Sequence, residues 1–274
     1  ALPAATLRDY SQSLLALAGR EQTALALHEV LFAELRDAGR AAARLPAGPA
    51  RDAAYAPGYA ALALLYPGSR PAGDISLSAS QIKTQQGGNV RLLAPGGAVD
   101  AGALTGSTGK RASELGLLTT AGGNIEAAVR SNFAVNQSRV FTLAQGDLLL
   151  WSSDGNIDAG KGARTVAGAP APVTTIDANG NVVVDTAGSF SGSGIAVLNA
   201  DSILDLYAPR GEISAGEAGI KPLGLAFLGA SAVIGTIEGS GNTVGAPAPP
   251  PPAGATSSLA ALSQSVAAPG SSTT

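Results

Sequence analysis

Three aspartates and two basic residues lie close together between positions 147 and 164. They are Asp147, Asp154, Asp158, Lys161 and Arg164. Carboxylates that converge on one strand face, alone or beside a lysine or arginine, can cleave polysaccharides by general acid–base chemistry. The three aspartates also flank glycines of turns, where aspartate is favoured because its side chain hydrogen-bonds the local backbone. The spacing therefore favours a structural role, with catalysis as the alternative.

Other reactive side chains are scarce in this chain. There is no cysteine and a single histidine, His28, which excludes thiolate chemistry, cysteine-ligated metals and multi-histidine metal sites. The string Gly122-Gly123-Asn124 is the nearest approach to a calcium-binding glycine–aspartate repeat, but no aspartate follows it. We therefore predict no catalytic residue, no metal site and no cofactor, and interpret His28 as a packed histidine on a helix.

The composition of the whole chain excludes further classes of protein. Seventeen basic and 20 acidic residues give a formal net charge of −3, without the excess positive charge that nucleic-acid binding requires. No apolar run approaches the roughly 20 residues that span a bilayer, so we expect no transmembrane segment. The 274 residues include no methionine, so we expect a processed piece, or a fragment, of a longer polypeptide.

Between residues 73 and 244 glycine recurs regularly, and apolar residues follow a period of two. The recurring unit is a glycine, then an aspartate, asparagine or glutamate, then an aliphatic residue. It occurs at Gly73-Asp74-Ile75, Gly88-Asn89-Val90, Gly123-Asn124-Ile125, Gly146-Asp147-Leu148, Gly155-Asn156-Ile157, Gly180-Asn181-Val182 and Gly211-Glu212-Ile213. Each triplet combines a turn residue, a side chain that bonds its own backbone and the start of a strand.

Three longer segments of this region can be superposed. Each contains two strand starts at the same spacing, at Val90 and Val99, Leu148 and Ile157, and Leu204 and Ile213. Such repetition predicts a solenoid, and the narrow aliphatic core favours a parallel β-helix over residues 73–244. The two offsets between copies are nearly equal, at about 57 residues, and correspond to two or three coils of roughly 20–28 residues each. Seven or eight coils at about 4.8 Å each would make a rod about 35–40 Å long.

The alternation also predicts which side chains face the core of the coils. They are Val90, Leu92, Val99, Leu148, Leu150, Ile157, Leu206, Ile213 and either Ile203 or Leu204. An antiparallel sandwich, with Val90 and Val99 on neighbouring strands, is the arrangement that would contradict this prediction.

Residues 1–45 show a helical pattern instead. Apolar residues recur at spacings of mostly three and four in one stripe: Leu7, Tyr10, Leu14, Leu17, Leu25, His28, Phe32, Leu35, Ala42 and Leu45. Gly19 is expected to divide this segment into two helices, and Pro46 to end the second. A stripe this apolar would expose a patch that soluble proteins avoid. We therefore expect it to cover an end or a face of the solenoid, or to lie on another chain.

Two proline-rich stretches complete the predicted organisation. Residues 46–72 contain five prolines and predict a connector, which Tyr55, Tyr59 and Tyr66 could attach to the neighbouring domain. Residues 245–274 consist almost entirely of Pro, Ala, Ser, Gly and Thr and predict an extended, low-complexity tail.

Two features of the β region could be mistaken for binding sites. Trp151, the only tryptophan, could stack on a sugar, but packing beneath the segment 163–175 is the favoured interpretation. Four turn asparagines, Asn89, Asn124, Asn156 and Asn181, are expected to stack into a stabilising ladder.

Binding residues are expected where a segment leaves the coils, because stacking fixes the coil positions themselves. The two long departures are residues 103–115 and 163–175. Their charged residues, predicted as possible partner contacts, are Lys110, Arg111, Glu114 and Arg164. Solvated loops without a partner are the alternative.

Several strings in the chain resemble the C-terminal region of filamentous-haemagglutinin-type exoproteins of two-partner secretion systems. They are VLFAELR at 30–36, SQIKT at 80–84, LLAPGG at 92–97, NQSRVFTL at 136–143 and WSSDGNIDAG at 151–160, and the last two are the most specific. The resemblance covers residues 25–245. It implies a right-handed parallel β-helix that a Gram-negative bacterium secretes through an outer-membrane partner pore, with a structural and adhesive shaft and no catalytic residues.

We therefore expect a mainly β, right-handed parallel β-helix with an N-terminal helical segment, secreted or held at the cell surface. Its expected function is non-enzymatic: a structural or adhesive segment that binds a protein or carbohydrate surface through its side faces and loops. A structural subunit of a larger surface assembly and a carbohydrate-active enzyme are the alternatives. Carboxylates converging in an open groove would favour the enzyme, and stoichiometric partner chains would favour the assembly.

Overall fold

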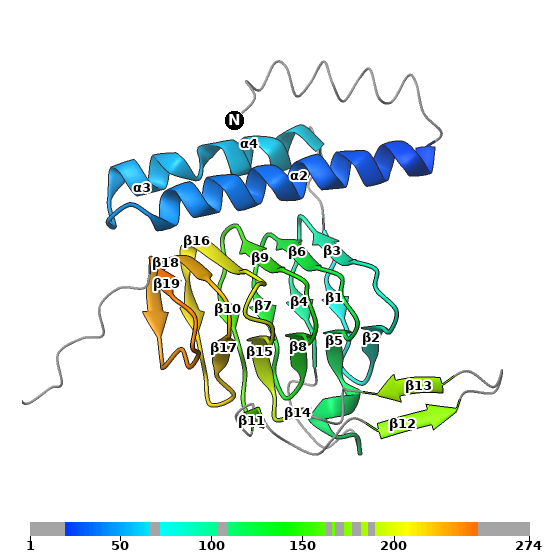
Figure 1. Cartoon of the computed structure of the whole chain (residues 1–274). Helices are drawn as coiled ribbons and strands as arrows, with labels where there is room; N and C mark the ends of the chain where they lie inside the picture. Colours follow the sequence, from blue (N-terminus) through cyan, green and yellow to red (C-terminus); the bar gives the residue numbers. More distant parts are fainter. Residues whose placement is uncertain are drawn as a thin grey trace, which may run out of the picture.

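The computed structural model describes residues 20–65, 72–102, 109–162, 166–167, 173–176, 182–185 and 190–245. Within them the chain is mainly β, as predicted. Parallel strands stack in a solenoid-like arrangement, and a layer of helices lies along one side of the stack (Figure 1). Residues 1–19 of the expected helical segment and residues 246–274 of the expected tail lie outside the described residues.

The helical layer consists of α2 (Arg20–Ala43), α3 (Pro49–Ala54) and α4 (Ala56–Leu65). The end of α2 agrees with the break predicted at Pro46, whereas the break predicted at Gly19 lies outside the described residues. Two short helices, α3 and α4, form within the stretch expected to be a connector. Prolines 49 and 57 lie in their first turns, where a missing N–H removes no intrahelical hydrogen bond.

The coils are built from three series of parallel strands, which we call faces. The first face contains β1 (Ile75–Ser76), β4 (Val99–Asp100), β7 (Phe133–Ala134), β10 (Ile157–Asp158) and the second halves of β16 (Leu204–Ser214) and β18 (Ala226–Ile234). The second face contains β2 (Gln81–Thr84), β5 (Gly116–Thr119), β8 (Arg139–Thr142), β15 (Gly194–Val197) and β17 (Ile220–Pro222). The third face contains β3 (Val90–Ala94), β6 (Ile125–Val129), β9 (Leu148–Ser152), the first halves of β16 and β18, and β19 (Thr243–Val244).

The strand register on the third face shows where each coil begins and ends. Successive partners are Val90, Ile125, Leu148, Leu204, Ala226 and Thr243. The first predicted offset, from Val90 to Leu148, therefore spans two coils, whereas the second, from Leu148 to Leu204, is one coil with a long insertion. Our expectation of several coils in each offset was wrong for the second, because the insertion is about as long as a further coil. Six strand levels stack on this face of the described chain, fewer than the seven or eight predicted.

The long insertion lies between β10 and β15. Its described strands form two antiparallel pairs, β11 (Val166–Ala167) with β14 (Phe190–Ser191) and, between them in the chain, β12 (Val173–Ile176) with β13 (Val182–Asp185). Antiparallel pairing separates these strands from the parallel coils. Val182, the aliphatic residue of one predicted triplet, therefore starts a hairpin strand rather than a coil strand.

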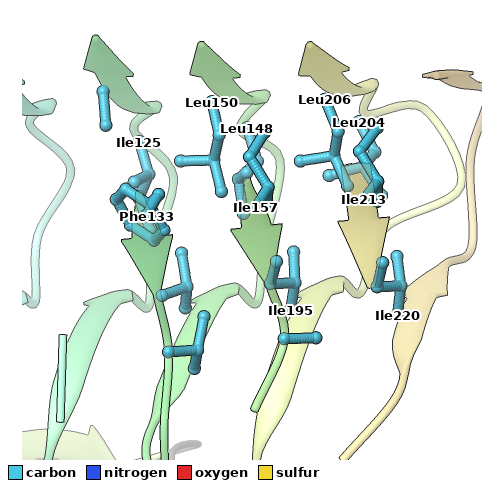
Figure 2. Packing of buried hydrophobic residues seen from close by; sticks show 14 of the residues in the cluster. Ile125, Phe133, Leu148, Leu150, Ile157, Ile195, Leu204, Leu206, Ile213 and Ile220 are labelled. Atoms are coloured by element: carbon cyan, nitrogen blue, oxygen red, sulfur yellow. The ribbon is translucent and has the colours of Figure 1, made fainter. Parts of the chain in front are cut away.

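The core of the coils is aliphatic and is built by stacking. The predicted inward residues all belong to this buried cluster, and none is more than 8% exposed. Leu204 faces the core, whereas Ile203 packs on the helical side. Figure 2 shows Leu148 and Leu150 beside Leu204 and Leu206, which pair with them one level further along. Val90 and Val99 each pair with parallel strands, which contradicts the sandwich.

The helices cover the outer side of the third face of the same chain. Leu31, Phe32 and Leu35 of α2 form a second buried cluster with Trp151 and Tyr207 of the sheet. Within the predicted stripe Phe32, Leu35 and Ala42 are buried. Of the three locations considered for the helices, the described part of the segment therefore occupies a face of its own solenoid.

Candidate functional surface

The three candidate catalytic aspartates do not converge. Asp147 and Asp154 lie at opposite ends of β9, a strand of five residues, so roughly 15 Å of extended chain separates them. The Asp147 carboxylate accepts a hydrogen bond from the backbone N–H of Ile203 (2.8 Å), and that of Asp158 accepts one from Gly160 (2.9 Å). These contacts are the backbone bonds expected of turn aspartates. Arg164, also part of the candidate set, lies outside the described residues.

Two side-chain ladders join successive coils at their corners. In the first, the Oδ1 atoms of Asn89, Asn124 and Asp147 accept the backbone N–H groups of Asn124, Asp147 and Ile203, at 2.8–2.9 Å. In the second, the Oδ1 atoms of Asn132 and Asn156 accept the N–H groups of Asn156 and Glu212, both at 2.9 Å.

These ladders revise the prediction of a single asparagine stack. Asn89 and Asn124 share a ladder, whereas Asn156 belongs to the other corner and Asn181 lies outside the described residues. Each amide oxygen bonds the backbone of the next coil rather than another side chain. Because a bonded backbone group is held in place, the ladders fix both the register and the turn geometry.

Residues 109–115, the described part of the loop predicted to contact a partner, are held in a defined position; residues 103–108 lie outside the described residues. The Lys110 Nζ donates a hydrogen bond to the backbone carbonyl of Ala79 in the first coil (2.7 Å). Glu114 closes a short 3₁₀ helix, Ala112–Glu114, by accepting the backbone N–H of Arg111 (2.8 Å) and pairing with its guanidinium (3.4 Å). The hydrogen bond from the Arg111 backbone is the largest cause that lowers the pKa of Glu114. The Arg111 side chain is 84% exposed, so this charge is presented to solvent from a fixed backbone.

Trp151 packs beneath the helices, and not beneath the segment 163–175 as we predicted. Its ring makes edge contacts with Tyr55 (5.8 Å between centroids), Tyr59 (5.7 Å) and Tyr207 (6.1 Å). The indole N–H donates to the Ser153 hydroxyl at 3.1 Å. Trp151 is fully buried, which excludes it as a sugar-stacking platform in this conformation.

A buried ion pair fixes the C-terminal half of α2 to β16. Both nitrogens of one edge of the Arg40 guanidinium bond the Asp205 carboxylate, at 2.9 and 2.6 Å, and the Tyr207 hydroxyl donates to the same carboxylate at 2.6 Å. Burial raises the pKa of Asp205, although the hydrogen bonds from Arg40 and Tyr207 lower it. Burial and the neighbouring carboxylate raise the pKa of Tyr207. None of these three residues could be singled out from the sequence, because neither repeat nor spacing links position 40 with position 205.

A network of exposed ion pairs lies at the corner that follows β9. The Asp154 carboxylate pairs with Arg130 (3.2 Å) and Arg210 (2.6 Å), so the three residues connect three successive coils. The Arg210 guanidinium lies over the Tyr59 ring, 4.7 Å from its centroid. Burial is the main cause that raises the pKa of Tyr59 to about 12. Asp154 therefore stabilises the stack, and both of its oxygens are already engaged.

The described residues contain no group of three or more His, Asp or Glu side chains placed to hold a metal ion. His28 is half-buried on α2, where burial and the nearby Arg91 lower its pKa. Across the same described part of the chain, no helix is both long and apolar enough to span a membrane.

Stacked parallel coils, corner ladders and one face covered by helices define a protein of the parallel β-solenoid class. Residues 145–248 match the family model described as filamentous haemagglutinin family outer membrane protein. The matched range contains the WSSDGNIDAG string, and the match confirms the resemblance inferred from the sequence. The searches of curated proteins and of solved structures found no match.

Proposed function

We propose that this chain is a non-enzymatic structural and adhesive segment of a secreted or cell-surface exoprotein of the filamentous-haemagglutinin type. Its coils are right-handed, it is exported by two-partner secretion from a Gram-negative bacterium, and it binds a protein or carbohydrate surface through a side loop. The family match over residues 145–248 is the observation that carries this proposal.

The placement of the charged groups supports a binding role over a catalytic one. Asp147 and Asp158 bond turn backbones, and Asp154 pairs with two arginines, so none is arranged beside another as an acid–base pair. The loop 109–115 differs, because it holds exposed charge and is tied to the first coil by the Lys110 side chain and by the backbone N–H of the following Gly116. A fixed, charged loop loses less conformational freedom on binding than a mobile one.

Binding of the fluorescently labelled chain to cultured epithelial cells tests the proposal. We expect saturable binding by the parent chain and at least a tenfold weaker affinity for Lys110→Ala/Arg111→Ala. The thermal stability of this variant should be nearly unchanged, because exposed loop charges alter stability by less than about 0.5 kcal/mol.

The matched control is Arg36→Ala/Arg130→Ala, which also removes two exposed cations from surface ion pairs. We expect it to bind as the parent does. Equal losses in both double variants would show that binding depends on overall charge and not on the loop. Absence of binding by the parent would contradict the adhesive role.

A further inference from the structure

The two ends of the coil stack present unpaired strand edges within the described residues. At one end β1, β2 and β3 each pair with a single neighbour, and at the other end β19 pairs only with β18. All these strands are parallel within the stack, so the first coil of one molecule could pair with the last coil of another as the next level of the same stack. Open edges of this kind are templates for further strand pairing.

The side chains at the two ends are also complementary. Asn242 precedes the third-face strand of the last coil, as Asn89 precedes that of the first, so both occupy the position of the first ladder. In that ladder each amide oxygen accepts the N–H group of the next coil. The Asn242 side chain would therefore accept the N–H of Asn89 in a second copy. Ile234, beside this end, is 50% exposed.

Helix α2 is longer than the stack that it covers. Glu29 pairs with Arg91 of β3, in the first coil (3.5 Å), and Ala43 lies against Gly245, just after β19. The segment from Arg20 to Glu29 then extends about 14 Å beyond the first coil, at 1.5 Å per residue. This distance equals nearly three levels of about 4.8 Å. Figure 1 shows the start of α2 projecting past β3, and Leu25 in this part is 56% exposed.

The projecting turns obstruct the addition of a second copy. If the last coil of the second copy paired with the first coil of the first copy, Ala43 of the second copy would lie at the level that Arg20–Glu29 of the first copy already occupy. We propose that the two ends form a head-to-tail interaction surface between copies of this chain, and that the projecting turns of α2 prevent its use. A head-to-tail contact of this geometry does not close on itself, so its release would yield filaments. This inference goes beyond the proposed function and does not depend on it.

Sedimentation velocity over a hundredfold range of protein concentration tests the proposal. The full chain should stay monomeric. Full-length Ala26→Pro, which ends the helix at the proline and leaves residues 29–43 in place, should form linear oligomers whose mean mass rises at least threefold with concentration. Ala26→Ser keeps the helix and should remain monomeric. Deletion of residues 1–28 should reproduce the proline result, whereas deletion of residues 1–19 should not.

A second substitution identifies the surface that is released. Ile234→Lys, added to Ala26→Pro, places charge at the open end and should restore the monomer. Ala41→Lys, on the exposed side of α2, should leave the oligomers intact. Folding of each variant is checked by circular dichroism. A monomeric, folded Ala26→Pro chain, oligomers of the parent chain at the same concentrations, or oligomers that persist with Ile234→Lys would each overturn the proposal.

Discussion

The core of the coils and the interface beneath the helices are both buried, but they are built in different ways. In the core, Leu150, Leu206 and Leu228 occupy equivalent positions on successive levels, so one kind of contact is repeated along the axis. Beneath the helices, one tryptophan, three tyrosines and one buried ion pair each make a contact that occurs once. A core residue therefore has equivalent residues on the neighbouring levels, whereas each interface residue has a partner that occurs only once.

This difference predicts how the two regions respond to damage. A defect in the core should weaken the whole stack, because each coil is stabilised by the coils on either side. A defect beneath the helices should first release α2, α3 and α4, because the strands retain their own pairing. Trp151, the only tryptophan, lies at the interface, so its fluorescence reports on the helical layer, while amide hydrogen exchange of the strand residues reports on the coils.

The largest effect should come from Leu206→Ala in the core. The side chain is fully buried between levels, so its truncation leaves a cavity and should lower the free energy of unfolding by about 3–4 kcal/mol. Urea denaturation should show the fluorescence and strand signals shifting together. The control Ile234→Ala, at an exposed position, should shift neither by more than about 0.5 kcal/mol. A shift confined to the fluorescence signal would contradict the comparison.

Asp205→Ala should destabilise the interface by about 2 kcal/mol, because it leaves the Arg40 guanidinium without its carboxylate partner. Arg40 is 20% exposed and can be partly hydrated, which keeps the loss below that of a fully buried charge. The double variant Arg40→Met/Asp205→Leu should recover part of this loss. Hydrogen exchange should increase in α2 while the strands stay protected. Equal exchange in both regions would show that the helices and coils unfold as one unit.

Gly39→Ala should be destabilising by about 1–2 kcal/mol, although alanine in place of glycine ordinarily stabilises a helix by about 1 kcal/mol. The reversal is expected because the Tyr207 ring occupies the space that the added methyl group would need. In the background of Tyr207→Ala the same substitution should become stabilising. This double-mutant cycle is measured by urea denaturation, and a stabilising Gly39→Ala in the parent chain would refute the close contact.

The smallest effect should be a dependence on pH in the helical layer. Burial and Arg91 lower the pKa of His28 below its ordinary value of 6.5, so the unfolded chain binds a proton more readily than the folded one. This contribution to stability is therefore present above pH 6.5 and is lost as the pH falls towards the lowered pKa of the folded state. Relative to His28→Gln, the parent chain should lose thermal stability between about pH 7.5 and pH 5.5. If the parent chain and His28→Gln differed in thermal stability by the same amount at both pH values, His28 would not be the source of the pH dependence.

The candidate binding loop shows what local sequence could indicate. Charge at Lys110, Arg111 and Glu114 stood out because the surrounding β region has few charges, and the structure places all three in one ordered loop. The lysine contact with Ala79 could not have been predicted, because the two residues lie 31 positions apart and no motif links them. Contact of this loop with a partner remains a prediction.

The sequence by itself determined the features that repeat. A glycine, a short polar residue and an aliphatic residue at each strand entry were sufficient to predict parallel coils and their inward side chains, because stacking imposes the same requirement on every coil. The tertiary structure alone decided the features that occur once. It showed that the segment from Leu148 to Leu204 is one interrupted coil, that Trp151 lies under α2 and α4, and that Arg40 pairs with Asp205. Such contacts depend on where an entire helix meets an entire sheet, and no local spacing in the chain encodes that position.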